Sequence, residues 1–168
     1  MSSPALHPLR LRIAEPTDVE ALVCLINAAF LVERFFIEGD RIHAGEVRKL
    51  MGTGQFLVAK DVAHDDDGIC GCVYVEPRGD RAYLGLLSID PSRQRNGLGS
   101  RLVTAAEEHA RAANIRHMDL RIVNLRQELP EFYRKLGYVF TGTSPFPPDV
   151  TTKQPCHFIN MSKPLLSA

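Results

Sequence analysis

The sequence has no excess of charge of either sign. Its 168 residues include 20 Lys and Arg and 20 Asp and Glu, so the formal net charge is zero. Generic nucleic-acid binders and proteins that adsorb to anionic membranes draw their affinity from a basic surface. The charge balance argues against such a surface, and we expect neither a nucleic-acid partner nor a membrane partner.

Long apolar runs and paired cysteine motifs are also lacking. No apolar run approaches the roughly 18 residues of a membrane-spanning helix, and the first residues do not read as a secretory signal. The cysteines, Cys24, Cys70, Cys72 and Cys156, show neither C-x-x-C nor zinc-finger spacing. We interpret them as reduced thiols, expect no metal site, and predict a cytoplasmic protein.

The length suits one domain, so we treat residues 1–168 as a single domain. Thr17 and Glu20 have the spacing of a capping box at the start of the first helix. Hydrophobic periodicity predicts helices at about 19–30, 44–51, 98–113 and 129–136 and strands at about 9–13, 55–59, 69–76, 81–89, 117–123, 138–141 and 156–161. This order predicts an α/β fold, in which helices cover both faces of a mixed central sheet as a three-layer α/β/α sandwich.

A strand, a glycine-containing loop and a helix follow one another across residues 84–103. Pro91 ends the strand, and the helical pattern begins at Leu98. The first N–H groups of a helix have no internal partner, and the helix dipole makes that end partly positive. Gly97 and Gly99 carry no Cβ, so an anion can approach the backbone closely. The junction therefore predicts a phosphate-binding site.

The loop matches one nucleotide-binding pattern better than others. A P-loop run is missing, and Leu102 stands where a dinucleotide-binding fingerprint would have its third glycine. The segment Gln94-Arg-Asn-Gly-Leu-Gly99 instead reads [QR]-x-x-G-x-[GA]. It resembles the acetyl-CoA-binding motif of the GNAT N-acetyltransferase superfamily. Phe132-Tyr-Arg-Lys-Leu-Gly-Tyr138 resembles that family's F-Y-x-x-L-G-[FY] segment, and the element order is similar from residue 9 to residue 161.

The resemblance implies an enzyme that uses acetyl-CoA as cosubstrate and needs no metal. It implies direct transfer of the acetyl group, in a ternary complex, to a primary amine of a small molecule or peptide. The backbone of Leu87–Ile89 is expected to pair with the pantetheine arm, and Tyr133 to lie near the CoA sulfur as a general acid. The implied coenzyme-binding residues are Leu87, Ser88, Ile89, Gln94, Arg95, Asn96, Gly97, Leu98, Gly99, Ser100, Asn124 and Tyr133.

The general base and the acceptor are less defined by the sequence. We assign the base to Glu76, at the end of a central strand, with Tyr83, Ser88 and His157 as further candidates. Phe35 and its neighbour Phe36 either form a wall of the acceptor site or close the core. Transfer of a longer acyl group and a non-catalytic acyl-CoA-binding module are the alternative functions, and the protein is expected to be a monomer or a homodimer.

Overall fold

A seven-stranded sheet forms the centre of the protein. The structure is a computed structural model that describes residues 8–62, 68–93 and 97–166. The strand order is β1-β2-β3-β4-β5-β7-β6. The strands are β1 (Leu9–Ile13), β2 (Gln55–Asp61), β3 (Ile69–Arg78), β4 (Arg81–Ile89), β5 (His117–Val123), β6 (Val139–Pro145) and β7 (His157–Pro164).

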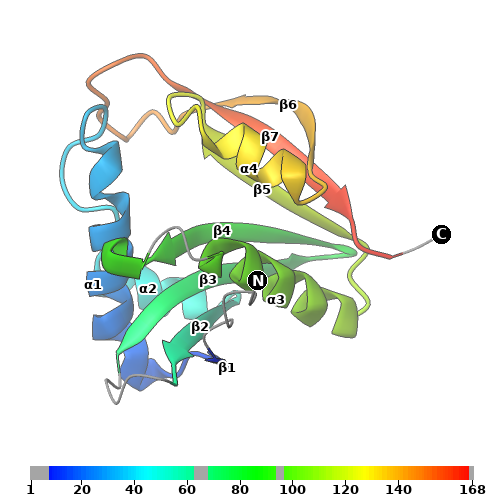
Figure 1. Ribbon diagram of the computed structural model, residues 1–168. Helices are drawn as coiled ribbons and strands as arrows, with labels where there is room; N and C mark the ends of the chain where they lie inside the picture. Colours follow the sequence, from blue (N-terminus) through cyan, green and yellow to red (C-terminus); the bar gives the residue numbers. More distant parts are fainter. Residues whose placement is uncertain (1–7, 63–67, 94–96, 167–168) are drawn as a thin grey trace, which may run out of the picture.

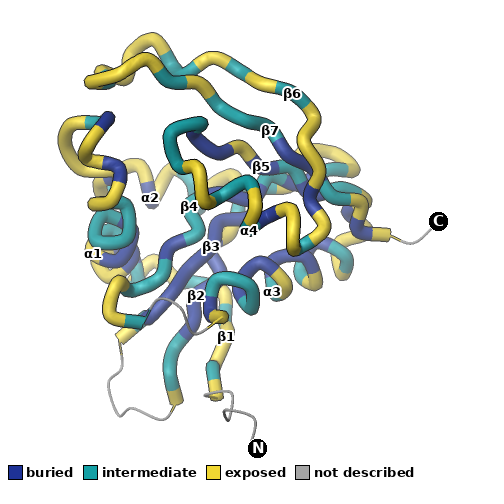
Figure 2. The backbone as a smooth tube through the Cα atoms, turned by 45° about the horizontal axis from the view of Figure 1, so that its top comes forward, coloured by how far each residue is buried: buried dark blue, intermediate teal, exposed yellow. Residues whose placement is uncertain are grey.

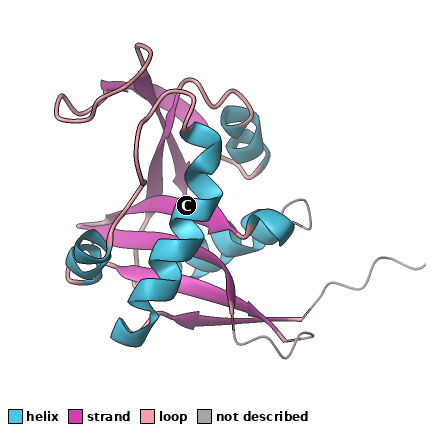
Figure 3. Ribbon diagram, turned by 90° about the vertical axis from the view of Figure 1, so that its left-hand side faces the viewer, coloured by secondary structure: helices cyan, strands magenta, loops and turns pink. Residues whose placement is uncertain are grey.

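Helices cover both faces of this sheet (Figure 3). The helices α1 (Val19–Ala29) and α2 (Ala44–Met51) pack on one face, and α3 (Leu98–Ala112) and α4 (Leu129–Lys135) pack on the other. The predicted three-layer fold and its element order are therefore confirmed. Within the described ranges, none of the helices is long and apolar enough to cross a membrane.

The strand β3 lies between two apolar cores. Val73 and Val75 belong to the core under α3, whereas Cys72 and Tyr74 belong to the core under α1 and α2. This burial on both faces explains why the strand reads as a nearly continuous apolar run, and Figure 2 shows it in dark blue. Cys70 and Cys72 are free thiols here, and burial raises the pKa of Cys72 to about 12.

The sheet splits between β4 and β5, which run parallel. These strands pair only from Arg81–Tyr83 to His117–Asp119, whereas β4 stays paired with β3 as far as Ile89. At the split Leu86 has a φ of 52°, and the register against β3 shifts there, as in a β-bulge. The bulge bends β4 away from β5, and Figure 1 shows the two halves of the sheet opening as a V.

The chain enters α1 differently from the sequence prediction. Thr17 and Glu20 do not form the capping box. Instead the Asp18 carboxylate accepts a hydrogen bond from the Glu15 N–H at 2.7 Å, and a short 3-10 turn, Pro16–Asp18, precedes the helix. Arg12 on β1 donates to the same carboxylate at 2.7 and 2.9 Å. The capping box therefore begins at Glu15, two residues earlier than predicted, and the ion pair between Arg12 and Asp18 holds the start of the helix against the sheet.

Candidate functional site

The edge of β4 faces the opening between the two halves of the sheet. Because pairing with β5 ends at Tyr83, the backbone from Leu84 to Ile89 borders this opening. A buried backbone edge needs hydrogen-bonding partners, and an extended ligand can supply them as an added strand does. The predicted coenzyme residues Leu87, Ser88 and Ile89 all lie on this part of β4.

The Ser88 side chain stabilises the bulge. It is buried, and its hydroxyl donates a hydrogen bond to the Leu86 carbonyl at 2.9 Å. This bond occupies the hydroxyl and stabilises the left-handed backbone at Leu86, which costs free energy in a residue other than glycine. A role of Ser88 as general base therefore has no support from its surroundings.

The N-terminus of α3 lies at the same opening. Gly97 is the N-cap residue, with a φ of 70° and ψ of 11°, and the buried Leu98 anchors the first turn in the core. A Cβ at Gly99 would lie 3.4 Å from the Phe132 ring and 3.9 Å from Leu87. The predicted loop residues at the helix therefore lie between β4 and α4, with Ser100 half-buried in the first turn. Gln94, Arg95 and Asn96 lie outside the described residues.

Tyr133 is the buried residue of α4, with an exposed fraction of 5%. The sequence placed it beside a stripe of Leu129, Phe132 and Leu136, but those three are only half-buried. These three side chains pack against the core under α3, as the stripe predicts, but Tyr133 is more buried than any of them because it packs edge-on against both Phe132 and Tyr138, at ring-centroid distances of 4.9 and 5.7 Å.

The surroundings of the Tyr133 hydroxyl keep it protonated. Burial raises its pKa above the ordinary value for tyrosine, Tyr83 adds to the rise, and Arg126 opposes it. The hydroxyl forms no hydrogen bond with any residue that the structure describes. It is therefore a proton donor held near the opening without an acceptor from the described chain.

Glu76 lies on the opposite face of the sheet from Tyr133. It shares its face with Tyr74, whose hydroxyl donates to the carboxylate at 2.9 Å, and Arg78 Nε donates to it at 2.5 Å. Burial alone would raise the pKa of Glu76, but the hydrogen bonds from Arg78, Tyr74 and Thr53 outweigh it and leave the pKa lowered. Glu76 is thus a carboxylate at neutral pH, and the strand continues past it to Arg78.

Two neighbours of Glu76 were missed by sequence reasoning. Tyr74 and Arg78 stand two residues before and after it, and alternate residues of a strand share a face. This alternation can be read from the sequence, and it would have predicted that Tyr74 and Arg78 donate hydrogen bonds to the Glu76 carboxylate. Tyr83 pairs with Glu76 across β3 and β4, and its charge contributes to the raised pKa of Tyr133.

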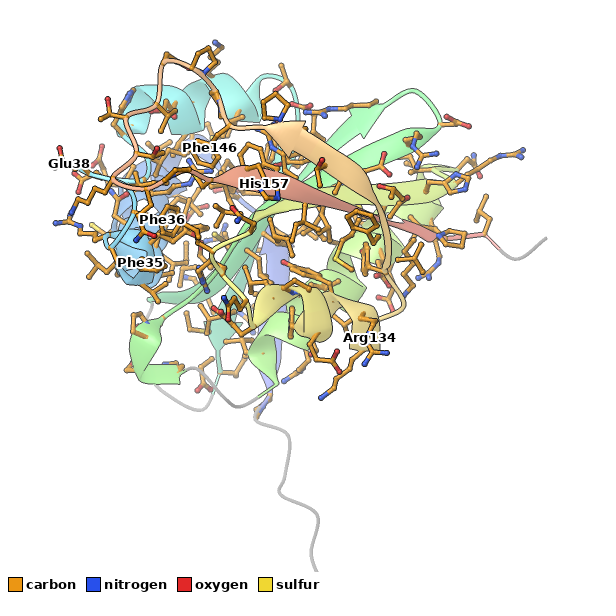
Figure 4. All side chains as sticks on the ribbon, turned by 90° about the horizontal axis from the view of Figure 1, so that it is seen from above. Phe35, Phe36, Glu38, Arg134, Phe146 and His157 are labelled. Atoms are coloured by element: carbon orange, nitrogen blue, oxygen red, sulfur yellow. The ribbon has the colours of Figure 1, made fainter. Side chains whose placement is uncertain are left out.

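Asn124 joins the end of β5 to β7. Its side-chain carbonyl accepts a hydrogen bond from the His157 N–H at 2.9 Å, and its own N–H donates to the His157 carbonyl at 2.9 Å. The side-chain oxygen is therefore used within the protein. His157 is exposed at the start of β7, on the side of the molecule that carries Phe146 in Figure 4.

The segment after α1 is tied to the loop between β6 and β7. Phe36 is fully buried, whereas Phe35 is 49% exposed. The Lys153 N–H donates to the Phe36 carbonyl at 2.7 Å, and Ile37 forms an isolated bridge with Thr152. Phe36 therefore closes the core, and only Phe35 remains available as a wall of the site; Figure 4 shows both beside that loop.

The comparison with protein families decides the family. A family model described as "Acetyltransferase (GNAT) domain" matches residues 52–140, which run from the end of α2 into β6. The chain belongs to the GNAT acetyltransferase family. The match covers the split strands, the glycine loop with α3, and α4, so the resemblance seen in the sequence is confirmed. Over the described part of this GNAT chain, no group of three or more His, Cys, Asp or Glu side chains is placed to hold a metal ion.

Individual relatives agree with the family assignment. The chain is 32% identical over 81 residues to "Probable N-acetyltransferase 14" of Xenopus tropicalis, and this segment spans 47% of the chain but only 39% of that relative. The ribosomal-protein-S18-alanine N-acetyltransferase of Escherichia coli has the same fold, with a TM-score of 0.74, 16% identity and 96% of each chain covered. The yncA structure from Salmonella typhimurium, solved with its cofactor acetyl-CoA, gives a TM-score of 0.71, 19% identity and 95% of each chain covered.

Proposed function

We propose that the chain is an acetyl-CoA-dependent N-acetyltransferase that moves an acetyl group to a primary amine of a small molecule or peptide. The observation that carries the proposal is the divergence of β4 from β5 beside the glycine N-terminus of α3. An extended coenzyme arm can lie in that opening while its phosphates meet the helix. Family membership and the yncA structure with acetyl-CoA support the same coenzyme.

The coenzyme is held mainly by backbone groups in this proposal. The N–H groups of Gly97 to Ser100 face the pyrophosphate, with Gln94, Arg95 and Asn96 as the remaining predicted ligands of the loop. The backbone of Leu87–Ile89 pairs with the pantetheine amides. A backbone N–H at this edge also polarises the acetyl carbonyl and stabilises the oxyanion that forms on attack.

Tyr133 supplies the proton for the leaving group. The amine nitrogen forms a bond to the acetyl carbon, the carbon–sulfur bond breaks, and the sulfur takes the proton of the Tyr133 hydroxyl. A free thiol has a pKa of about 8.5, but the burial that raises the pKa of Tyr133 would also destabilise a thiolate beside it. Burial therefore makes the thiolate a stronger proton acceptor than it is in water, while Tyr133 stays protonated until the thiolate forms and can act as its general acid.

Glu76 receives the proton of the acceptor in the proposed reaction. An ammonium group has no lone pair and must lose a proton before it attacks. Because its pKa is lowered, Glu76 is a weak base, and we place it at the end of a water-mediated path rather than in contact with the amine. We favour direct transfer over a covalent intermediate on a cysteine of the central strand. Burial is the largest cause that raises the pKa of Cys70 and of Cys72, and a thiol with a raised pKa is a poor nucleophile.

We also propose a cytoplasmic location, since buried free thiols persist most readily in a reducing compartment. Cell fractionation tests this proposal. Sedimentation would distinguish the monomer from the homodimer.

Release of CoA thiol from acetyl-CoA across a panel of primary amines tests the function. The same samples are heated with and without CoA to measure the shift in melting temperature. Turnover of any amine supports the transferase, and a thermal shift without turnover of any amine favours a non-catalytic binding module. Repeating the assay with longer acyl-CoA thioesters tests the acyl preference.

A further inference from the structure

A hollow of about 420 Å³ lies beside the point where β4 and β5 separate. Its lining includes Tyr83 on β4 and Asp119 and Arg121 on β5, which alternate with residues of the core under α3. The hollow therefore opens on the face of the sheet opposite α3 and α4, the same face that carries Glu76. It is not the surface that the proposed coenzyme occupies.

Aromatic rings contact both arginines that line this hollow. The guanidinium carbon of Arg78 lies 4.6 Å from the ring centroid of Tyr83. The guanidinium carbon of Arg121 lies 4.3 Å from the ring centroid of Phe158 and 5.9 Å from that of Tyr83. Phe146 stacks on Phe158 at 4.6 Å. Contact with ring faces stabilises a guanidinium but uses none of its in-plane N–H groups, which are five strong donors in a fixed fork.

Arg121 is also the unpaired charge of the hollow among the residues described. Arg78 is paired with Glu76 at 2.5 Å, and Asp119 is paired with Arg81 at 2.6 Å. By contrast, Arg121 forms neither an ion pair nor a hydrogen bond with any residue in the described ranges, and it is exposed. The hollow therefore has a positive charge whose hydrogen-bonding edge meets no acceptor from the described part of the chain.

The position of this cation relates it to the reaction. Arg121 stands two residues beyond Asp119, the last residue of β5 that pairs with β4. A group bound to Arg121 thus lies next to the start of the exposed β4 edge, and a backbone N–H of this edge polarises the acetyl carbonyl in the proposed reaction. An acceptor in the hollow would present its amine to the opening while Arg121 binds another part of the same molecule.

We propose that the acceptor is an amine that also has a carboxylate, such as a free amino acid or a short peptide, and that Arg121 binds this carboxylate. The planar fork of arginine matches a carboxylate with two parallel hydrogen bonds. This inference rests on the proposed acetyl transfer and specifies its substrate class.

The test measures CoA thiol release with a panel of free L-amino acids and their C-terminal amides, at saturating acetyl-CoA. Each acid and its amide share the reacting amine, so only the carboxylate differs. A hydrogen bond to a charged group predicts a preference of about 10- to 100-fold in kcat/KM for the acid. Arg121→Gln should remove this preference mainly through KM, Arg121→Lys should restore it only in part, and Arg10→Gln on the outer strand β1 is the matched control.

The outcomes separate this inference from the proposed function. Loss of the preference in Arg121→Gln, with unchanged turnover of amides and unchanged KM for acetyl-CoA, supports the inference. Turnover of amines without preference for the acids, or an equal fall for acids and amides in Arg121→Gln, overturns it and leaves the transferase in place. Turnover of no acid and no amide overturns the inference, and the wider panel of primary amines then decides the transferase: no turnover of any amine, with CoA still bound, overturns that as well.

Discussion

Tyr83 on β4 and Asp119 on β5 form the last residue pair between these two parallel strands. Beyond this pair β4 bends at Leu86 and diverges from β5, so the sheet opens directly after Tyr83. The glycine N-terminus of α3 and the buried Tyr133 lie on one face of the opening, and Glu76 and Arg121 lie on the other. The predictions below test these assignments separately.

The first prediction concerns the glycine loop. Gly97→Val should weaken acetyl-CoA binding, because a branched side chain at a φ of 70° strains the loop and obstructs the backbone N–H groups that face the pyrophosphate. Calorimetry measures the affinity.

Gly79→Val is the matched control for this variant. Gly79 has a φ of 69° in the turn between β3 and β4, and an added Cβ would meet no atom within 4 Å at either glycine. Both variants should therefore lose similar stability, and only Gly97→Val should lose affinity. Wild-type affinity in a folded Gly97→Val protein would contradict this placement of the coenzyme.

The second prediction concerns two buried tyrosines whose rings are 5.7 Å apart. Tyr133→Phe should lower kcat and kcat/KM together by roughly 10-fold or more, as expected on loss of a general acid. Its melting temperature and acetyl-CoA affinity should change little, because its hydroxyl has no hydrogen-bonding partner among the described residues.

Tyr138→Phe should show the reverse pattern. The Tyr138 hydroxyl donates to the buried Glu107 carboxylate at 2.9 Å, so its removal should cost about 1–3 kcal/mol of stability. The turnover number should stay near the wild-type value. If Tyr133→Phe turns over at the wild-type rate, its ring serves only in packing.

The third prediction concerns Glu76 and pH. Because the pKa of Glu76 is lowered, its carboxyl group is deprotonated at every pH above the ordinary pKa range of glutamate. Its titration should therefore affect kcat/KM only in acid. Between pH 6 and 9 the rate should rise with the free-amine fraction of the acceptor, which for an α-amino group increases around a pKa of about 8. Glu76→Gln should lower the rate across this range, and an unchanged rate would assign proton removal elsewhere.

The sequence predicted the architecture well because the element patterns are local. The bounds of β1, β4, β5 and α2 agree with the prediction, since alternation, helical period and the turn residues around them are all read within a few positions. The glycine loop was recognised for the same reason, as its strand, Gly97 and helix are continuous in the chain.

The details of the site depend on contacts between distant residues. Asp18 displaced the predicted capping box because Arg12 lies on a neighbouring strand. Tyr133 proved to be the centre of the α4 interface because Tyr138 folds back against it. The place of Arg121 over Tyr83 and Phe158 arises only when three strands come together, and no single segment indicates it.

A fourth prediction tests the ion pair between Glu33, in the segment after α1, and Arg126, in the segment after β5. Arg126 donates to the buried Glu33 at 2.9 Å, from 93 positions away in the sequence. Burial raises the pKa of Glu33 and Arg126 opposes the rise, so Arg126→Ala leaves a buried carboxyl without its partner. We expect a loss of about 3 kcal/mol in urea unfolding. Arg134→Ala, which breaks an exposed pair with Glu131, should cost far less stability, and equal losses in the two variants would contradict the argument.

The last prediction follows the Arg12–Asp18 pair through pH. The hydrogen bond from Arg12 is the largest cause that lowers the pKa of Asp18 from 3.8 to about 2. A carboxyl whose pKa is lower in the folded state stabilises the fold above its unfolded pKa, and this contribution is lost as the pH falls toward the folded pKa. The stability lost in Asp18→Asn should therefore be full at pH 7 and shrink between about pH 4 and pH 2. Urea unfolding of both proteins across this range measures the difference.

The control is Asp40→Asn, which breaks an exposed pair with Arg34 and should show little loss of stability at any pH. A loss in Asp18→Asn that is the same at pH 2.5 as at pH 7 would mean that the carboxylate acts through its shape and not through its charge.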